Sequence, residues 1–287
     1  MAASIRDIKQ KVVATKKTSQ ITNAMNMVSA SKLKGAQKAT LNFQPYMKRI
    51  EDIIINLASN CEELDHPLLK EREGNKTCYL LITSDRGLAG PFNSSLCKLL
   101  SSKIDKSQDI VATLGVKGYF YCKQKKYNLI DDVVRLPDDV VFDNIYPTIS
   151  KIIEMYLNGE VDKVVLIYNH FVNTLSIVPT EKQILPIEDN FSDKVDETNH
   201  IYDYEGGINS ILDTVLPLYI ENLVYGIILD SKASEHASRM TAMQNATDNA
   251  KDVISKLEIM YNRARQAAIT LELTDIIGGA NAANGGN

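Results

Sequence analysis

The sequence predicts an α/β protein in which the N- and C-terminal helices form a long antiparallel coiled coil that carries an inserted Rossmann-like α/β lobe. Helical spacing of apolar residues extends over 1–57 and over 207–278, whereas 75–199 alternates short strand-like runs with helical patterns. A helix as long as the C-terminal one needs a partner to bury its apolar stripe, and the first segment is the other long helix that the sequence predicts.

The segment 1–57 is predicted to be helical because its apolar residues recur at intervals of three or four. This spacing is interrupted over 15–19, so we expect a break in the register there. Pro45 should kink the helix or end it near Gln44, because proline lacks the amide hydrogen that a helix needs. The two apolar sets are Ile5, Ile8 and Val12, and then Ile21, Met25 and Val28.

The segment 75–199 is predicted to fold as an α/β lobe. Buried strands that alternate with helices are typical of a domain with a mainly parallel sheet. The acidic, proline-containing stretch 185–199 should be an exposed loop. The strand-like runs are 78–83, 110–114 and 164–168, and the helical patterns between them are 94–104 and 145–157.

The segment 207–278 is predicted to be one long helix, kinked at Pro217 and ended by Gly278 and Gly279. At about 1.5 Å per residue, some 70 residues span roughly 100 Å, which exceeds an ordinary globular core. The apolar stripe alternates steps of three and four, as in a coiled-coil seam. It comprises Met243, Ala246, Ala250, Val253, Leu257, Met260, Ala264, Ala267 and Leu271.

Composition excludes several classes of protein. The 287 residues allow one or two domains, and 44% hydrophobic with 24% charged residues argue against wholesale disorder. The uninterrupted apolar runs are shorter than the ~18 residues that cross a bilayer, and we identify no signal-peptide pattern. The absence of CxxC spacing argues against structural zinc and a disulfide framework. The cysteines are Cys61, Cys78, Cys97 and Cys122.

The net charge of −4 hides a basic first segment. Residues 1–50 contain ten Lys or Arg and one acid, a net charge of +9, so the rest of the chain carries −13. Such a segment fits nucleic acid, an anionic membrane surface or an acidic protein partner, and equally a solvated helix face. It lacks the interleaved aromatic residues of a single-strand binder, since the first aromatic is Phe43.

The sequence contains no convincing catalytic constellation. The loop 84–91 follows the first predicted strand, where nucleotide-binding folds hold phosphate. It lacks the Rossmann and Walker glycine patterns, so a tight turn with a surface pair of Asp85 and Arg86 is favoured. The histidines lack metal-ligand spacing. Glu272 and Asp275 share one face near the end of the last helix, where a solvated or partner-facing pair is favoured over an acid–base pair.

Four motifs resemble those of the γ subunits of F-type ATP synthases. They occur in order along the whole chain, which makes a chance match negligible. The motifs are KTSQITNAMNMVSASKL at 17–33, SDRGLAG at 84–90, SKASEHASRMTAM at 231–243 with NATDNA after it, and ITLELTD followed by GGA at 269–280.

The resemblance implies the central shaft of a rotary motor. In this family the two terminal helices turn inside an α3β3 hexamer, and the lobe stands beside the ε subunit on the membrane ring of c subunits. The resemblance implies no catalytic residue, cofactor, metal or nucleic acid, and contact with the membrane only through the c ring. The expected location is the cytoplasmic face of a bacterial cell membrane, with an organellar inner membrane as the alternative.

The resemblance also implies contact residues in the last helix. Arg265 and Gln266 match a polar pair that meets a loop of a β subunit, although a solvated helix face is the alternative. Thr270, Glu272 and Asp275 lie in the closing motif, where we expect contacts within the bearing or with the first helix.

Two further sets of residues follow from the resemblance. Met25 and Met27 are expected to face the C-terminal helix and a β subunit, with plain coiled-coil packing as the alternative. Four residues are expected at the foot of the stalk, near ε and the c ring, with an ordinary surface loop as the alternative. They are Tyr202, Asp203, Tyr204 and Glu205.

Two other functional classes compete with this interpretation. A nucleotide-dependent enzyme would use 75–199, and a melting shift of the isolated chain with nucleotide would support it. A free-standing coiled-coil adaptor would not co-purify with α, β and ε subunits. The sequence leaves the coupling ion and the direction of the reaction in the cell open.

Overall fold

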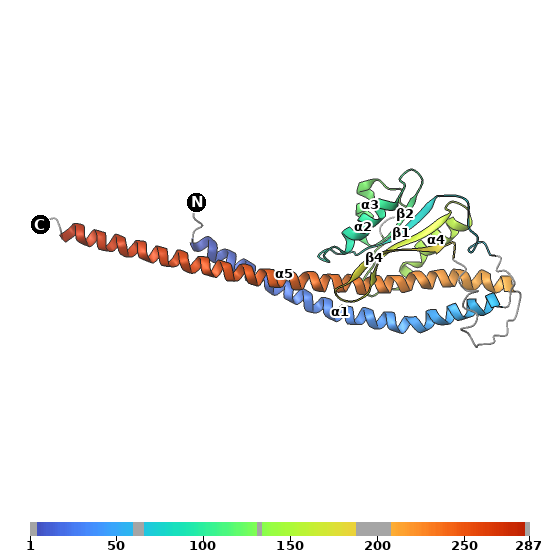
Figure 1. The fold of residues 1–287 in the computed structure, drawn as a ribbon, viewed down its shortest axis with the longest axis horizontal. Coiled ribbons are helices and arrows are strands. Elements are labelled where there is room, and N and C mark those ends of the chain that lie inside the picture. Colours follow the sequence, from blue (N-terminus) through green and yellow to red (C-terminus); the bar gives the residue numbers. More distant parts are fainter. Residues whose placement is uncertain (1–4, 60–65, 131–133, 188–207, 285–287) are drawn as a thin grey trace. The chain divides into compact units, whose positions relative to one another are not determined.

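The computed structural model describes residues 5–59, 66–130, 134–187 and 208–284 (Figure 1). The chain divides into two compact units, each described here by itself: unit 1 comprises Met1–Val28 and Ala242–Asn287, and unit 2 comprises Ser29–Thr241. Both long helices contribute to both units. The elements are α1 (Ile5–Ser59), β1 (Thr77–Ile82), α2 (Phe92–Lys103), β2 (Ile110–Leu114), α3 (Val116–Lys125), η1 (Phe142–Asn144), α4 (Tyr146–Leu157), β3 (Lys163–Phe171), β4 (Ile177–Leu185) and α5 (Ile208–Asn284).

Unit 2 contains a four-stranded sheet in the order β2-β1-β3-β4. β1 pairs in parallel with β2 and with β3, while β4 pairs antiparallel with β3 and forms one edge. The predicted α/β lobe with a mainly parallel sheet is therefore confirmed. Two elements are not predicted by the sequence patterns: α3, half of whose residues are Lys or Tyr, and β4, whose central residues are polar.

Helices cover both faces of this sheet. On β1, Tyr79 and Leu81 join the apolar cluster that includes α2 and α3, whereas Leu80 and Ile82 join the cluster that includes α1, α4 and α5. Side chains alternate between the faces of a strand, so β1 is buried on both. This explains why its sequence is apolar throughout rather than alternating.

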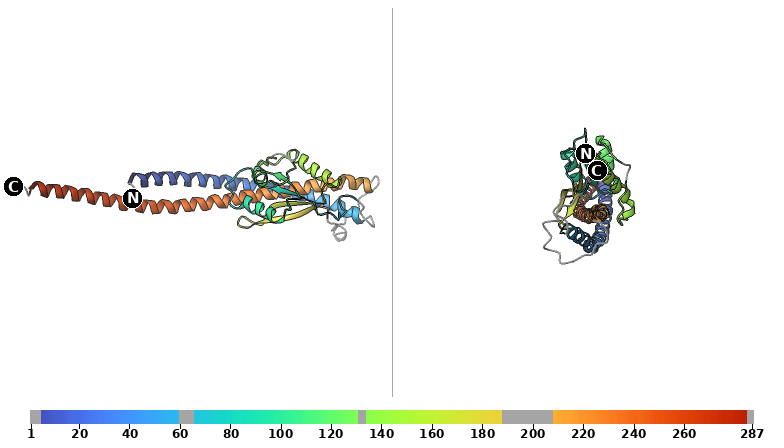
Figure 2. Two further views of the ribbon diagram at one scale, coloured as in Figure 1. Left: turned by 90° about the horizontal axis from the view of Figure 1, so that it is seen from above. Right: turned by 90° about the vertical axis from the view of Figure 1, so that its right-hand side faces the viewer.

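The second half of α1 and the first part of α5 lie side by side against the sheet and build the larger core (Figures 1 and 2). One window of 18 residues within α5 is apolar enough to cross a membrane by length and composition, and 44% of it is buried inside the structure. A buried core helix has the same composition. The residues that α1 and α5 contribute to this core include Ile50, Ile54, Leu57, Leu212, Leu216, Ile220 and Val224.

Neither proline inside a long helix ends it. α1 continues through Pro45 to Ser59, so the predicted end near Gln44 is wrong. Pro45 lies on the exposed face of α1, where water can bind the carbonyl that proline leaves without an amide partner. Beyond it, Ile50 and Ile54 are anchored in the core. α5 likewise continues through Pro217.

Two predicted boundaries are also wrong. α5 continues through Gly278 and Gly279 to Asn284, because glycine lowers helix stability by about 1 kcal/mol but permits helical backbone angles. The predicted loop 185–199 begins inside the fold, since Leu185 closes β4 and is buried, as is Ile187. Residues 188–199 lie outside the described residues.

The inward face of α1 in unit 1 follows an unbroken alternation of three and four. The predicted break at 15–19 is wrong because Thr15 and Ser19 occupy half-buried seam positions. Ile21 and Val28, which the sequence analysis placed on the stripe, are 61% and 54% exposed. Small hydroxyl residues fit a close approach of two helices and can bond within their own helix, as Thr15 does to the Lys11 carbonyl at 2.8 Å.

The inward face of α5 in unit 1 keeps only part of the predicted stripe. Val253 and Met260 are exposed, and Ala267 and Leu271 are exposed as well. Thr247, Ile254 and Tyr261, which were not on the predicted stripe, lie on the inward face. The buried or half-buried face comprises Met243, Ala246, Thr247, Ala250, Ile254, Leu257, Tyr261 and Ala264.

Replacing Gly115 by Ala should destabilise unit 2. Gly115 has a φ of +98°, and a Cβ added there would lie 2.1 Å from the Thr83 carbonyl oxygen. We expect the free energy of unfolding to fall by at least about 2 kcal/mol in urea titrations. Gly35→Ala is the matched control, because a Cβ added within α1 there meets nothing within 4 Å. It should stabilise by about 0.5–1 kcal/mol, and equal effects of the two changes would contradict this account.

Candidate functional site

Two regions carry the candidate functional residues, one in each unit. In unit 1 the region is the outer surface of α1 and α5, which contains the contact residues that the sequence analysis selected. In unit 2 the region is a cavity between α5, the loop that follows β1 and the segment 134–139 that follows α3. This cavity borders buried charges to which the sequence analysis assigned no role.

The outer surface of unit 1 is rich in large apolar side chains. Met27 of α1 is 64% exposed, and Leu271 and Ile276 of α5 are 65% and 62% exposed. The seam also contains Thr22 and Thr247, whose hydroxyl oxygens lie 2.7 Å apart. Apolar side chains gathered on an outer face indicate a surface that another protein covers. The other such residues are Val13, Ile21, Val28, Val253, Ile259, Met260, Ile269, Leu273 and Ile277.

The last turns of α5 have no packed face. Every side chain from Arg265 to Ala280 is exposed. Helices in proteins gain most of their stability from packing an apolar face, and this stretch packs on nothing within the described part of unit 1. This stretch is therefore a free surface on which a partner could pack.

All five contact residues predicted on α5 lie in this exposed stretch. They are spread over about 15 Å of helix and do not converge on a cleft. The Thr270 hydroxyl donates to the Gln266 carbonyl at 2.9 Å. In the described structure Thr270, Glu272 and Asp275 are exposed rather than buried against α1, and so are Arg265 and Gln266. The arrangement suits contact with a partner rather than bond chemistry.

The two methionines predicted as contacts point to different sides of α1. Met25 is half-buried on the side of the seam, whereas Met27 is exposed. Only Met27 therefore offers a free apolar surface. The residues predicted at the foot of the stalk lie outside the described residues: Tyr202, Asp203, Tyr204 and Glu205.

Part of the basic charge of 1–50 gathers at the start of α1. A shallow groove of about 440 Å³ is lined there by Arg6, Lys9 and Lys17, among others. Beside these residues, Lys16 pairs with Glu258 at 2.7 Å, with both side chains about half exposed. An exposed pair of this kind adds at most about 1 kcal/mol, so the basic face is chiefly a surface feature.

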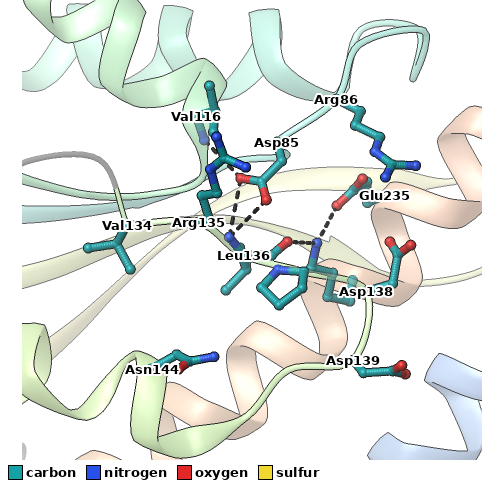
Figure 3. A pocket seen from close by; sticks show the side chains of 12 residues that line it. Asp85, Arg86, Val116, Val134, Arg135, Leu136, Asp138, Asp139, Asn144 and Glu235 are labelled. Carbon is teal, nitrogen blue, oxygen red and sulfur yellow. Dashed lines mark hydrogen bonds and ion pairs between the residues drawn. The ribbon is translucent and has the colours of Figure 1, made fainter.

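Unit 2 has a cavity of about 1050 Å³ at the carboxyl ends of β1 and β2, beside α5 (Figure 3). This is the edge at which α/β folds bind phosphate. The charged residues that line it have both signs, so the cavity is not an anion site by charge alone. They are Asp85, Arg86, Arg135, Asp138, Asp139, Lys232 and Glu235.

Asp85 occupies the place where a bound phosphate would need free amides. Its carboxylate accepts hydrogen bonds from the Val116 amide at 3.0 Å and from the Leu136 amide at 3.0 and 3.2 Å. Val116 begins α3, so a negative charge already caps this helix N-terminus and would repel a phosphate. The predicted surface pair of Asp85 with Arg86 is therefore wrong, and the cavity chemistry argues against nucleotide.

Three charged side chains of α5 are buried beside this cavity. Lys232 and Glu235 are each 3% exposed, and Arg239 is 9% exposed. Glu235 accepts hydrogen bonds from Lys232 Nζ at 2.9 Å and from Arg239 Nη2 at 2.7 Å. Lys232 also donates to the Leu136 carbonyl at 2.6 Å. Each buried charge thus has a charged partner, which burial requires.

His236 and Asp138 form a second polar contact next to these charges. His236 is 2% exposed, with its Nε2 3.6 Å from Asp138 Oδ1. Burial lowers the pKa of His236, and the nearby Arg239 and Lys232 charges lower it further against the opposing carboxylates. Burial raises the pKa of Asp138, but the hydrogen bond from Lys32 and the neighbouring cations outweigh it and keep that pKa below its ordinary value.

The sequence contained a signal for the buried charges. Lys232, Glu235 and Arg239 are three and four positions apart, so they share one face of a helix. They interrupt a stretch of small and apolar residues that a long helix must bury. Their partners in the loops 84–91 and 134–139 are far away in the sequence, and only the fold brings them together.

The described residues were also compared with the requirements of a metal site and of a reactive thiol. Within 5–59, 66–130, 134–187 and 208–284, no group of three or more His, Cys, Asp or Glu is placed to hold a metal ion. Burial raises the pKa of Cys78 and Cys122 to about 12 and that of Cys97 to about 11. These free thiols therefore disfavour the reactive thiolate.

Comparison with known proteins finds a family model and solved structures that match most of the chain. A family model described as ATP synthase matches residues 4–283. A central stalk/c-ring chain of the Tetrahymena thermophila mitochondrial ATP synthase is 26% identical, with a TM-score of 0.61 over 79% of this chain and 99% of that chain.

Two structures of the Euglena gracilis mitochondrial ATP synthase are also similar. A chain of its rotor is 17% identical, with a TM-score of 0.67 over 92% of this chain and 98% of that chain. A chain of its OSCP/F1/c-ring structure is 18% identical, with a TM-score of 0.70 over 98% of this chain and 95% of that chain. At these identities the two chains establish a likeness of fold.

Stability should fall with acid because of His236. Its folded pKa lies below the ordinary value of 6.5, so the unfolded chain binds the proton more readily and stability is lost as the pH falls through 6.5. We expect the free energy of unfolding of His236→Gln to depend less on pH between 7 and 5 than that of the wild type. Ser234→Ala is the control, since it removes a neighbouring buried hydroxyl without changing a titrating group. Parallel pH profiles of wild type and His236→Gln would refute this assignment.

Proposed function

Because this chain belongs to the ATP synthase family of F1 γ subunits, we infer that it is the central rotor shaft of an F1Fo ATP synthase. One observation carries this conclusion beyond the family match. The α1–α5 pair of unit 1 mixes hydroxyl and apolar residues in its seam and leaves many large apolar side chains on its outer face. A helix pair built only to pack on itself would not expose so many large apolar side chains.

We propose that an α3β3 hexamer surrounds unit 1 and covers this outer face. The exposed apolar residues supply a low-friction surface, and the polar residues among them supply contacts that depend on angle. The c-ring and F1 assemblies named for the similar chains support association at both ends of the shaft. We further propose that ε and the c ring contact the foot around 202–205.

The shaft acts by contact and performs no bond chemistry in this proposal. Its surface is asymmetric, so at any angle it presents different side chains to the three β subunits. Each catalytic site then favours a different conformation through the difference in contact free energy. Ion flow turns the ring and the shaft, and the coupling runs in both directions for binding equilibria.

Particular residues are proposed for these contacts. Arg265 and Gln266 meet a loop of a β subunit, since both are exposed on the unpacked part of α5. Thr270, Glu272 and Asp275 lie nearer the C-terminus of α5 and contact the part of the α3β3 hexamer that surrounds the end of the shaft. They belong to a motif within the residues that the family model matches. On α1, Met27 faces the ring whereas Met25 packs in the seam.

We propose that the complex is attached to an organellar inner membrane and that this chain touches the membrane only through the c ring. The mitochondrial origin of all three similar structures supports this location over the bacterial cell membrane. The coupling ion is a separate question, because the residues that bind it belong to other subunits.

Charge reversal at Arg265 should uncouple the motor without preventing its assembly. In Arg265→Glu we expect protons pumped per ATP hydrolysed to fall at least twofold, because a contact that depends on shaft angle becomes repulsive. Proton pumping and ATP hydrolysis are measured in parallel in reconstituted vesicles. Arg263→Glu is the matched control, an exposed arginine that lies two positions away and faces another side of α5. A normal pumping ratio in Arg265→Glu would exclude the proposed contact.

Hydrogen exchange should detect the ring around the exposed end of α5. In the isolated chain, backbone amides of 265–280 should exchange quickly, because no packed face protects this stretch. In the assembled complex we expect their exchange to slow at least 100-fold. Residues 212–228 of α5 are the internal reference, since they already lie in the core of unit 2. Fast exchange of 265–280 in the complex would contradict burial by the α3β3 hexamer.

A further inference from the structure

We propose that Glu235 is the positioning residue that fixes the rotational setting of α5 within unit 2, so that torque passes between the lobe and the shaft helix without slip. This role rests on the proposed rotor function. Glu235 is argued to act through its two cationic neighbours, and not by contact with another subunit.

The contacts of Glu235 form a bridge between α5 and two loops. One carboxylate oxygen accepts from Lys232 Nζ at 2.9 Å, and the other accepts from Arg239 Nη2 at 2.7 Å. Lys232 Nζ donates onward to the Leu136 carbonyl at 2.6 Å, and Arg239 Nη2 lies 3.5 Å from the Arg86 carbonyl. Glu235 therefore orients both cations, and each cation reaches a different loop.

A further hydrogen bond holds the same turn of α5. The Ser238 hydroxyl donates to the Ala89 carbonyl at 2.6 Å. Leu136 and the 84–91 loop are also tied to each other, because Asp85 accepts from the Leu136 amide at 3.0 Å. The two loops and α5 thus form one closed network of directional bonds, of which Figure 3 shows the part that runs from Asp85 through Leu136 to Glu235.

The network around Glu235 adds linked directional bonds to a contact that is otherwise largely apolar. Between 212 and 228, α5 contacts the lobe through apolar side chains, whose burial is non-directional, and through separate hydrogen bonds such as that from the Tyr225 hydroxyl to the Val140 carbonyl at 3.2 Å. A twisting load acts about the axis of α5. Hydrogen bonds from side chains that reach beyond the helix surface resist such a load, since their strength depends on distance and angle.

Stability alone does not account for these charges. Buried ion pairs contribute little net stability, because desolvation offsets their attraction, and well-packed apolar replacements are often as stable. A cluster of two buried cations and one buried anion is therefore better explained by the orientation that it imposes. A positioning role therefore predicts a loss of orientation, whereas a purely structural role predicts a loss of stability.

The test measures torsional stiffness of the rotor in the assembled complex. The α3β3 hexamer is immobilised, a bead is attached to the lobe through an introduced cysteine at the exposed Ser102, and angular fluctuations are recorded with the catalytic sites locked. In Glu235→Gln we expect the angular variance to rise at least twofold, with ATP hydrolysis within twofold of the wild type. Glu258→Gln is the matched control, because it removes an exposed Lys–Glu pair of the same helix and should leave the variance unchanged.

A second variant keeps the proposal testable if Glu235→Gln does not assemble. The triple change of Lys232, Glu235 and Arg239 to Leu replaces the charges with apolar packing and should retain thermal stability. We expect its angular variance to rise at least twofold as well. Wild-type variance in this stable variant would overturn the proposal, since a structural role alone would then suffice. Failure of the wild-type chain to assemble with α and β subunits would instead overturn the proposed rotor function.

Discussion

The structure depends on one constraint, which is that α5 must bury a stripe along 77 residues although the lobe is far too small to cover it. The solution changes along the helix. Its first part lies in the apolar core of unit 2, its residues 232–239 face the lobe with paired charges, and its residues 243–264 form a seam with α1. From Arg265 to Ala280 no described residue of the chain packs against α5, so in the proposed complex a partner buries this part.

The helical period of 3.6 residues was sufficient to predict the two long helices, and continuous apolar runs were sufficient to predict β1, β2 and β3 but not β4, whose centre is polar. It was not sufficient to predict which face of α1 turns inward. The seam uses Thr15, Ser19 and Thr22, whereas the apolar Ile21 and Val28 point outward. A method that assigns apolar residues to the inside fails where the outside is itself an interface.

The candidate sites were predictable to different extents for a physical reason. Arg265 and Gln266 are recognisable in a local motif, and their exposure follows from the absence of a neighbouring helix. The cluster around Glu235 depends on hydrogen bonds to Leu136 and Ala89 through its neighbours, which are separated from it by about a hundred residues or more. No local pattern contains these pairings, although unexplained charges in a buried helix mark where they must occur.

The crevice at the ends of β1 and β2 lies at the edge where other α/β folds bind phosphate, yet its groups bind one another. A phosphate there would need the free amides at the start of α3, and Asp85 already accepts a hydrogen bond from Val116. The same carboxylate binds the Leu136 amide, while the Leu136 carbonyl accepts from Lys232. The groups that would otherwise hold a ligand are thus used to join two loops to α5. A rigid connection at this edge is what a rotor requires, because an unfilled or exchanging ligand site would add compliance where torque must pass.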